Sequence, residues 1–397
     1  MTGSSTSTSP TSLLIIGSGP AGNAAAKAYR EGGGAGTVRI VTDEHHPPYD
    51  RPPLSKEYLR GESAESDLPL EDEGFYDQHD IELVLGAEVV ALDTAQRAVR
   101  LVDGRRIGYE SLLLATGSWS KVPGIDGADH ADVVLLRSWD EGVTLRHRAE
   151  DARSAIVVGS GFIGCEAAVS LARRGLAVTM VTSESRPQAK RLGPDVAERI
   201  ARWLSQDDVT LIGDARIASI EDGRVVVLEN GDRHEADLVV LATGASPRTD
   251  PFTGAGLAMT GGRISVDEHL RTSDPHVFAA GDIAWAHHPK AGRSLAVEHW
   301  GDAEAMGAVV GTVVAGGEAA WEDVPGFFTG IGDRWLMYAA WGDGYDVVRF
   351  EGGDPTQDSP FTAWYLQDGV VVGVLAYNSD DDYERGKQLI AEGAGLD

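Results

Sequence analysis

The chain has 397 residues, 42% of them hydrophobic and 24% charged, which is too many for one hydrophobic core and predicts two or three soluble domains. Asp and Glu outnumber Lys and Arg by 62 to 34, and the net charge of −28 argues against nucleic acid or an anionic membrane surface as a partner, because both would repel the chain. Cys165 is the sole cysteine, which excludes an intramolecular disulfide and a Cys-rich metal site, so we expect no metal and a reducing, cytoplasmic location.

The N-terminal residues lack the features of a targeting segment. Residues 1–10 are mostly Ser and Thr, without a basic region or an apolar core, and predict a disordered tail. No apolar run approaches the roughly 20 residues of a membrane span. We expect a monomer or homodimer that does not enter a membrane.

An apolar run followed by spaced glycines forms the first chemical motif. Residues 13–16 (LLII) predict a strand buried on both faces of a parallel sheet. The following GSGPAG places Gly17, Gly19 and Gly22 at GxGxxG spacing. In this motif the first glycine permits a tight turn, the second lets the backbone approach a pyrophosphate, and the third allows close helix–strand packing.

The residues after the glycines complete a strand–helix–strand unit. Residues 21–30 predict an Ala-rich helix whose free amides and positive dipole end face the phosphates. A second strand over 38–41 leads to Asp43, which is 21 positions beyond Gly22 (43 − 22). An acid at about this offset meets the ribose hydroxyls of an adenosine.

A Pro-rich segment follows, residues 45–61 (HHPPYDRPPLSKEYLRG). Its four prolines predict a stiff loop that is not the interior of a helix or strand. The loop holds two cations, Arg51 and Lys56. The alternative interpretation is a connector with solvated charges. Further on, residues 81–115 alternate short β-like runs with turns, and the strand over 112–114 leads into Ala-Thr-Gly, where backbone can again pass close to a cofactor.

The strand–turn–helix–strand unit occurs a second time. Residues 155–158 predict a strand, 162–174 a helix ended by Gly175, and 177–181 another strand. Between the first strand and the helix, GSGFIGCE repeats the glycine spacing at positions 159, 161 and 164. Two nucleotide-binding units in one chain imply two nucleotides.

The remaining chain predicts helices and strands in alternation, then a small α+β domain. After a helix over 196–204, strands are expected at 210–212, 225–228 and 238–241, with Asn230-Gly231 as the turn between the last two. A second Ala-Thr-Gly follows. Later elements are a strand over 277–279, a small-residue helix over 301–315, strands at 335–340, 347–350, 361–366 and 370–377 (the last two a hairpin through 367–369), and a helix over 380–392.

Asp282 follows the buried strand over 277–279 in the stretch FAAGDIA. Ligands of open α/β sheets bind outside the carboxyl ends of strands, so this carboxylate is a candidate to bind cofactor hydroxyls.

The motifs GSGPAG, RPPLSK, ATG, GSGFIGCE, ATG and FAAGDIA, in this order, resemble those of flavoproteins with two dinucleotide-binding domains. Within them the chain is similar to the oxygenase-coupled, NADH-dependent ferredoxin reductases of the putidaredoxin reductase type and their relative apoptosis-inducing factor. The similarity is good over residues 11–321 and weak beyond. It implies an α/β fold with an FAD-binding domain (11–120 and 247–321), an NAD(P)H-binding domain (121–246) and a C-terminal α+β domain (322–397).

The resemblance also implies site residues. Asp43 would hold the adenosine ribose, Val89 the adenine through its backbone, and Asp282 the ribityl chain, while Arg51, Lys56, Arg137 and Trp300 would lie near the flavin. The full set of cofactor-binding residues is Gly17, Gly19, Pro20, Ala21, Gly22, Asp43, Arg51, Lys56, Val89, Ala115, Thr116, Gly117, Arg137, Gly281, Asp282, Trp300, Gly159, Gly161, Phe162, Ile163, Gly164, Glu184, Ala242, Thr243 and Gly244.

Lys56 and Glu166 are the catalytic residues that the resemblance implies. An ammonium beside a reduced flavin stabilises its negative charge, and a carboxylate partner keeps a buried lysine charged and oriented. The alternative for Glu166 is an acid near a helix N-terminus, stabilised by the dipole. The sequence has no cysteine pair and no cysteine at the Lys56 position, so electrons should leave the flavin directly for an external acceptor.

Three acceptor schemes remain open from the sequence. The first is a ferredoxin or other electron-transfer protein. The second is a switch like apoptosis-inducing factor, in which nicotinamide binding controls dimerisation, and the third is a quinone or small molecule. For the donor, Glu184 lies 25 positions beyond Gly159 (184 − 159) and Asp43 lies 26 beyond Gly17 (43 − 17), so we predict that NADH is preferred and that Arg186 leaves NADPH possible.

Overall fold

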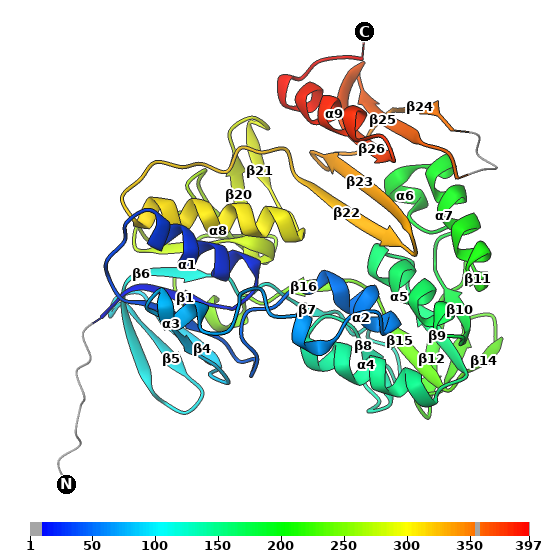
Figure 1. Cartoon of the computed structure of the whole chain (residues 1–397), viewed down its shortest axis with the longest axis horizontal. Coiled ribbons are helices and arrows are strands. Elements are labelled where there is room, and N and C mark those ends of the chain that lie inside the picture. The colour runs from blue at the N-terminus through cyan, green and yellow to red at the C-terminus, as the bar shows by residue number, and fades with distance from the viewer. Residues whose placement is uncertain (1–9, 354–357, 397) are drawn as a thin grey trace. The chain divides into compact units, whose positions relative to one another are not determined.

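The computed structural model describes residues 10–353 and 358–396 (Figure 1). The predicted N-terminal tail therefore lies, except for Pro10, outside the described residues. The chain divides into two compact units. Unit 1 comprises Met1–Asp50, Pro69–Ser118 and Pro247–Pro325, and unit 2 comprises Arg51–Leu68, Trp119–Ser246 and Gly326–Asp397. Residues 51–61 of the Pro-rich segment, which the resemblance put in the FAD-binding domain, group with the second glycine motif in unit 2.

Unit 1 is built on a parallel sheet. Its order is β3 (Ile81–Val84), β2 (Val38–Val41), β1 (Thr11–Ile16), β6 (Arg106–Leu114) and β19 (Val277–Ala279), and each pairing is parallel. The apolar run 13–16 is at most 3% exposed, so β1 is covered on both faces, as its sequence predicted. The first half of β6 continues into an antiparallel meander with β5 (Ala98–Leu101) and β4 (Val89–Asp93).

Two helices of unit 1 pack closely through small residues. α1 (Pro20–Glu31) lies against α8 (Trp300–Val314), as Figure 1 also shows. A Cβ at Gly307 would lie 2.1 Å from the Ala21 carbonyl oxygen, and one at Gly311 would lie 2.3 Å from that of Ala25. The glycines of α8 therefore set the approach of the two helices. The other elements of unit 1 are α3 (Phe75–Gln78), β17 (Met259–Thr260), β18 (Arg263–Val266), β20 (Ala284–His288), β21 (Arg293–Leu295) and the 3₁₀ turns Asp250–Phe252 and Gly281–Ile283.

Unit 2 has its own parallel sheet. The order is β11 (Val209–Ile212), β10 (Ala177–Val181), β9 (Ser154–Val158), β15 (Leu238–Leu241) and β8 (Val133–Leu135). The helices of this part of the unit are α4 (Trp139–Asp151), α5 (Phe162–Arg173), α6 (Ala189–Leu192) and α7 (Pro194–Gln206). The mixed α/β class and both predicted strand–helix–strand units are confirmed.

The Asn230-Gly231 turn does not join the two strands that the sequence predicted. It connects β13 (Val225–Leu228) to β14 (Arg233–Glu235), and β12 (Ile217–Glu221) completes this antiparallel meander. The prediction was wrong because β14 is short and polar, whereas the apolar run 238–241 satisfies the pattern of a strand equally well but belongs to the parallel sheet.

The C-terminal residues of unit 2 form an antiparallel sheet. Its order is β22 (Gly326–Ile331), β23 (Arg334–Ala340), β26 (Val370–Tyr377), β25 (Phe361–Gln367) and β24 (Val347–Gly352), and α9 (Asp380–Glu392) packs on β26. The predicted hairpin at 367–369 is confirmed. Strand β22 was not predicted, because its two glycines weaken the strand pattern.

The Pro-rich segment is helical in part, which corrects the prediction of a loop. Pro52–Ser55 form a 3₁₀ turn (η1), and Glu57–Arg60 form α2. Pro52 and Pro53 occupy the first positions of the turn, where no backbone N–H is needed, and both precede α2. In the described part of the chain, no helix is long and apolar enough to cross a membrane.

Candidate functional site

The glycine turn of unit 1 requires glycine on steric grounds. Gly17 has φ +111°, and a Cβ there would lie 2.2 Å from the carbonyl oxygen of Ala115, in the first Ala-Thr-Gly. A Cβ at Gly22 would lie 2.1 Å from the oxygen of Gly17. Real Cβ atoms do not approach backbone so closely, so β1, the turn and the end of β6 are held together only with glycine at both positions.

The glycine turn of unit 2 repeats this geometry. Gly159 has φ +101°, and its Cβ would lie 2.4 Å from the oxygen of Ala242 in the second Ala-Thr-Gly. A Cβ at Gly164 would lie 2.2 Å from the oxygen of Gly159. Each turn also has one hydrogen bond between two hydroxyl groups: Ser18 Oγ to Thr42 Oγ1 at 3.2 Å in unit 1, and Ser160 Oγ to Thr182 Oγ1 at 2.7 Å in unit 2. The two motifs are the same local structure.

The middle glycines have a different role. Gly161 has φ −62° and ψ 170°, values open to any residue, and a Cβ there would meet only the Gln188 side chain, at 4.0 Å. Neither α1 nor α5, both fully described, has a side-chain cap or an acid in its first turn, whereas α4, α7, α8 and α9 each begin with at least one acid. Free amides and an absent side chain fit a pyrophosphate at each turn.

The acids predicted for the first nucleotide lie within unit 1. Asp43 forms an ion pair of 2.6 Å with Arg248, so a cation holds it at the end of β2. Asp282 is 8% exposed and accepts a hydrogen bond of 2.8 Å from Ser118 Oγ. Thr116, in the Ala-Thr-Gly, donates to the carbonyl oxygen of Arg248 at 2.7 Å. Hydrogen bonds thus tie the carboxylates and the Ala-Thr-Gly segment into one edge of the unit.

The corresponding acid of unit 2 is anchored differently. Glu184 accepts a hydrogen bond of 3.0 Å from the backbone N–H of Lys190, and its own N–H donates to Thr182 Oγ1. Arg186, the residue that could favour a 2′-phosphate, forms an ion pair of 2.8 Å with Glu198. Gln188 is 9% exposed and donates to the Ser160 carbonyl in the phosphate turn at 3.0 Å.

Lys56 and Glu166 form a buried ion pair within unit 2. The Nζ–Oε2 distance is 2.8 Å, and the side chains are 6% and 3% exposed. Glu166 Oε2 also accepts from Ser55 Oγ at 2.6 Å, while Oε1 accepts from Thr329 Oγ1 at 2.6 Å and from the Gly330 N–H at 3.2 Å. Lys56 Nζ donates to the Pro52 carbonyl at 3.0 Å. The pairing that the resemblance implied is therefore present in the structure, with every lone pair of the carboxylate in use.

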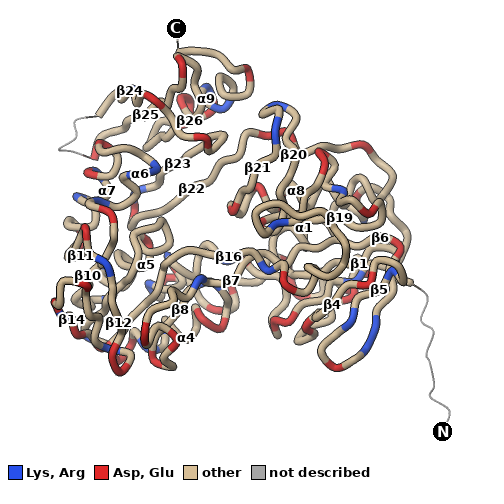
Figure 2. Tube along the Cα trace, turned by 180° about the vertical axis from the view of Figure 1, so that it is seen from behind, with Lys and Arg blue, Asp and Glu red and all other residues tan. Residues whose placement is uncertain are grey.

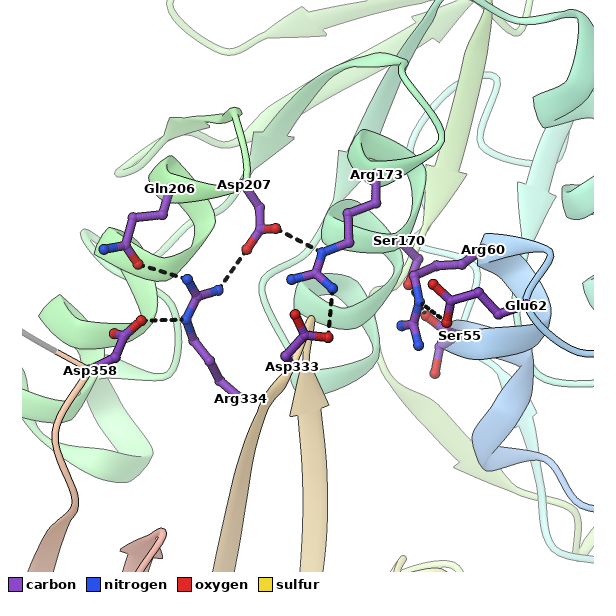
Figure 3. Close-up of polar contacts among 10 residues, drawn as sticks. All are labelled: Ser55, Arg60, Glu62, Ser170, Arg173, Gln206, Asp207, Asp333, Arg334 and Asp358. Atoms are coloured by element: carbon purple, nitrogen blue, oxygen red, sulfur yellow. Dashed lines mark hydrogen bonds and ion pairs between the residues drawn. The ribbon is translucent and has the colours of Figure 1, made fainter.

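Ion pairs also surround the C-terminal end of α5 (Figure 3). Arg173 contacts Asp207 at 2.8 Å and Asp333 at 2.9 Å, and Arg334 contacts Asp207 at 2.7 Å. Ser170 Oγ donates to the Ser55 carbonyl at 2.8 Å. The hydrogen bond from Arg173 is the largest of the effects that hold the pKa of Asp333 below its usual value. These contacts fasten the Pro-rich segment and the β22–β23 turn to the helix that carries Glu166.

The other predicted site residues fall in both units. In unit 1, Val89 begins β4 and is buried, and Trp300 begins α8. In unit 2, Arg51 precedes η1, and Arg137 precedes Ser138, the N-cap of α4. The structure thus brings together the residues of each turn and the Lys56–Glu166 pair, while the flavin residues implied by the resemblance are divided between the units.

Three residues around the second turn change the interpretation of the sequence. Ser55 and Thr329 were missed as partners of Glu166: Ser55 lies within RPPLSK and could have been suspected, whereas nothing in the sequence pointed to Thr329. Cys165 is fully buried, and burial together with the charges of Glu166 and Glu184 raises the pKa of its thiol well above the ordinary value. A thiol in this state is a poor nucleophile, as expected for electron flow that bypasses protein sulfur.

The chain is similar to known proteins. A family model described as pyridine nucleotide-disulphide oxidoreductase matches residues 11–307. The rubredoxin-NAD(+) reductase of Pseudomonas putida is 32% identical, with 80% of this chain and 84% of that protein covered. A ferredoxin--NAD(P)(+) reductase of Sphingomonas sp is also 32% identical, over 95% and 92%. The crystal structure of a covalent putidaredoxin reductase–putidaredoxin complex contains a chain that matches with a TM-score of 0.91 and 27% identity, covering 97% of this chain and 94% of that chain.

Proposed function

The chain belongs to the pyridine nucleotide-disulphide oxidoreductase family, and from that premise we propose that it is an FAD-dependent NADH:ferredoxin reductase. It takes a hydride from NADH and passes electrons singly to an iron–sulfur protein. The observation that carries the proposal is the repeated glycine turn, because two turns of one geometry, each at an uncapped helix N-terminus, provide for two dinucleotides in one chain.

The residues of unit 1 hold FAD in this proposal. Gly17, Gly19 and Gly22 admit its pyrophosphate to the amides of α1, with Pro20 and Ala21 in the first helical turn. Asp43 binds the ribose of the adenosine, and Asp282 binds hydroxyls of the ribityl chain. When bound, FAD accepts a hydride and releases electrons one at a time, chemistry that side chains cannot supply.

Lys56 and Glu166 assist the transfer. The ammonium is held within 2.8 Å of a carboxylate that is itself fully hydrogen-bonded, so the positive charge is fixed before the substrate arrives. A preorganised cation in a water-poor site stabilises developing negative charge without reorganisation. Their contact supports a role in catalysis more than it supports a helix-capping role for Glu166, because the carboxylate accepts from a lysine rather than from the first amides of α5.

We assign the second turn to NADH. The turn at Gly159, Gly161 and Gly164 takes its pyrophosphate, and Phe162 and Ile163 line the entry in the first turn of α5. Glu184, fixed by the Lys190 N–H, accepts from the 2′-hydroxyl and repels a 2′-phosphate. Arg186 could otherwise favour a 2′-phosphate, but its ion pair with Glu198 engages its charge.

The acceptor is proposed to be a ferredoxin or rubredoxin, the proteins that the names of the relatives mention. The buried, high-pKa thiol of Cys165 supports direct transfer to an external acceptor. Lys and Arg lie among the more numerous Asp and Glu on many elements (Figure 2), so local basic contacts can form although the net charge is −28. We also propose a cytoplasmic location, which fits a chain whose sole cysteine, Cys165, is a free thiol.

Stopped-flow spectrophotometry tests the proposal. We expect the purified protein to be yellow with about one FAD per chain, to be reduced rapidly by NADH, and to be reoxidised rapidly by a [2Fe–2S] ferredoxin or a rubredoxin. A colourless folded protein contradicts FAD binding. A reduced flavin that persists with NAD⁺ and reacts slowly with every acceptor points instead to a switch like apoptosis-inducing factor, and fast reoxidation by a quinone alone points to a small-molecule acceptor.

A further inference from the structure

We propose that Thr329 is a positioning residue for hydride transfer: strand β22 of the C-terminal sheet holds Glu166 and, through it, the ammonium of Lys56. The inference rests on the proposed function, because it needs Lys56 to act at the reduced flavin. It assigns the C-terminal sheet a part in the first half of the reaction, in addition to any part in partner recognition.

Strand β22 runs along one face of α5. Phe327 contacts Phe162 with ring centroids 4.8 Å apart, Thr329 contacts Glu166, and Asp333 in the following turn contacts Arg173. On α5 the three partners are offset by 4 and 11 residues, and these offsets lie within about 40° of one another around a helix of 3.6 residues per turn. Inward-facing residues 327 and 329 alternate with the exposed Phe328, as a strand requires.

The contact between strand and helix is long enough to fix its register. From Phe327 to Thr329 the strand advances about 7 Å, and from Phe162 to Glu166 the helix advances about 6 Å. The two segments therefore stay in register between the aromatic contact and the Thr329–Glu166 hydrogen bond, and the turn after β22 adds the ion pair of Asp333 with Arg173 at the end of α5. Thr329 consequently meets Glu166 from a backbone that is secured on both sides.

The four donors around Glu166 divide into two pairs. Thr329 Oγ1 and the Gly330 N–H donate to Oε1, while Ser55 Oγ and Lys56 Nζ donate to Oε2. A carboxylate has about four acceptor sites, so this set saturates it. Without the Thr329 hydroxyl, Oε1 keeps only the longer 3.2 Å bond from Gly330. A buried carboxylate that loses a donor rotates toward the remaining ones, and its second oxygen then leaves the position that aligns Lys56.

The loop side of the site supports the same assignment. Ser55 and Lys56 are adjacent residues, and Ser170 Oγ holds the Ser55 carbonyl from α5. Both groups that contact Oε2 therefore belong to one short, fastened segment. The orientation of the carboxylate is then set from the Oε1 side, where Thr329 makes the shorter of the two contacts, 2.6 Å against 3.2 Å.

The test compares Thr329→Val with a matched control. Valine keeps the shape of threonine and removes the donor. Thr362 supplies the control, because it is 1% exposed in the same sheet and donates to a carboxylate, that of Asp382, at 2.7 Å, away from Glu166. Lys56→Met serves as the reference for complete loss of the ammonium, and Thr329→Ser restores the hydroxyl. If Thr329→Val does not fold, Thr329→Ala replaces it.

Two readouts are measured on the purified holoenzymes: the rate of flavin reduction by NADH in single turnover, and the midpoint potential of the flavin. We expect Thr329→Val to slow reduction about tenfold to a hundredfold and to make the potential more negative, in the direction of Lys56→Met, with Thr329→Ser close to wild type. We expect Thr362→Val to change neither readout. A potential that moves in Thr329→Val but not in Thr362→Val or Thr329→Ser identifies positioning, since a general loss of stability would affect both valine variants.

The outcomes separate this inference from the proposed function. If Lys56→Met leaves both rate and potential unchanged, the proposed role of Lys56 is wrong, and this inference is wrong with it. If Lys56→Met changes both but Thr329→Val matches wild type, or matches Thr362→Val, only the inference is overturned. A crystal structure of Thr329→Val with the Nζ–Oε2 contact unchanged would overturn it as well.

Discussion

The two glycine turns of this chain have nearly the same backbone geometry, but their surroundings differ. Each places its first glycine against the alanine carbonyl of an Ala-Thr-Gly segment and its third glycine against the carbonyl of the first. The helices that follow differ two positions beyond the third glycine, where α1 has Ala24 and α5 has Glu166. In the proposed function the turn provides for the nucleotide in both units, and the helix face beside it decides whether the unit also contributes a charged group.

The neighbours of the two helices differ accordingly. Glycines of α8 approach the backbone of α1 at Ala21 and Ala25, so this face of α1 is covered by close apolar packing. In unit 2, the face of α5 that carries Glu166 meets Thr329 on one side and Ser55 on the other. Two helices that approach as closely as α1 and α8 can bury only small residues where they touch, whereas a helix packed against a strand and a turn has donors available for a buried carboxylate.

The largest effects are expected from the third glycines, and they should differ between the units. Gly22→Ala puts a Cβ 2.1 Å from a backbone oxygen and should yield protein without FAD, whereas Gly164→Ala should keep FAD and lose reduction by NADH. The measurements are flavin content and NADH titration. Gly124→Ala is the control, because nothing lies within 4 Å of its Cβ. Full flavin content in Gly22→Ala would show that the first turn does not bind FAD.

The second prediction concerns the lysine–glutamate pairs. Lys56→Ala should slow flavin reduction by NADH roughly 10²- to 10³-fold while FAD stays bound, because an ammonium beside developing negative charge is lost. Lys27 is the matched control, since it pairs with Glu71 at 2.6 Å in unit 1 but is 37% exposed. Stopped-flow absorbance of the flavin gives the rates. Equal rates for the wild type and Lys56→Ala would make the buried pair structural only.

Much of the two units, but not the surroundings of Glu166, could be predicted from the sequence. Apolar strands flanked by spaced glycines specify both units locally, so the fold class and the turns follow from the sequence. The partners of Glu166 do not, because Ser55 and Thr329 are 111 and 163 residues away, and only the tertiary pairing of β22 with α5 brings Thr329 there. The grouping of residues 51–68 with unit 2 is likewise a matter of long-range packing, to which Ser170 and Arg174 contribute.

A smaller effect is expected at Glu184, the acid that follows β10 in unit 2. Glu184→Gln should raise relative use of NADPH about tenfold, because the carboxylate that repels a 2′-phosphate becomes neutral while the side chain keeps its size. The ratio of kcat/KM for NADH to that for NADPH measures this. Glu198→Gln, which releases Arg186 from its ion pair, should change the ratio in the same direction by less. A wild-type ratio below one would show that Glu184 does not set the choice.

The smallest expected effect is a difference in pH dependence between substitutions at the C-terminal ends of α1 and α5. Arg30 at the end of α1 donates to the backbone carbonyls of His79 and Asp80, each at 2.7 Å, and to those of Gly34 and Gly36. Arg173 at the end of α5 contacts carboxylates instead. Carbonyls do not titrate, so the cost of Arg30→Met in the free energy of unfolding should be the same at every pH where the protein folds.

The cost of Arg173→Met should depend on pH. The hydrogen bond from Arg173 is the main reason that the pKa of Asp333 lies below its usual value, so the stabilisation is present above pH about 4 and is lost as the pH falls through the lowered pKa. Because Asp333 is 85% exposed, the pH-dependent part should be no more than about 0.5 kcal/mol. Urea unfolding from pH 7 down to the lowest pH at which the protein still folds gives the costs, and Asp333→Asn should reduce the dependence. A cost of Arg173→Met that stays constant down to the lowest pH would mean that Arg173 acts, like Arg30, through packing and neutral acceptors.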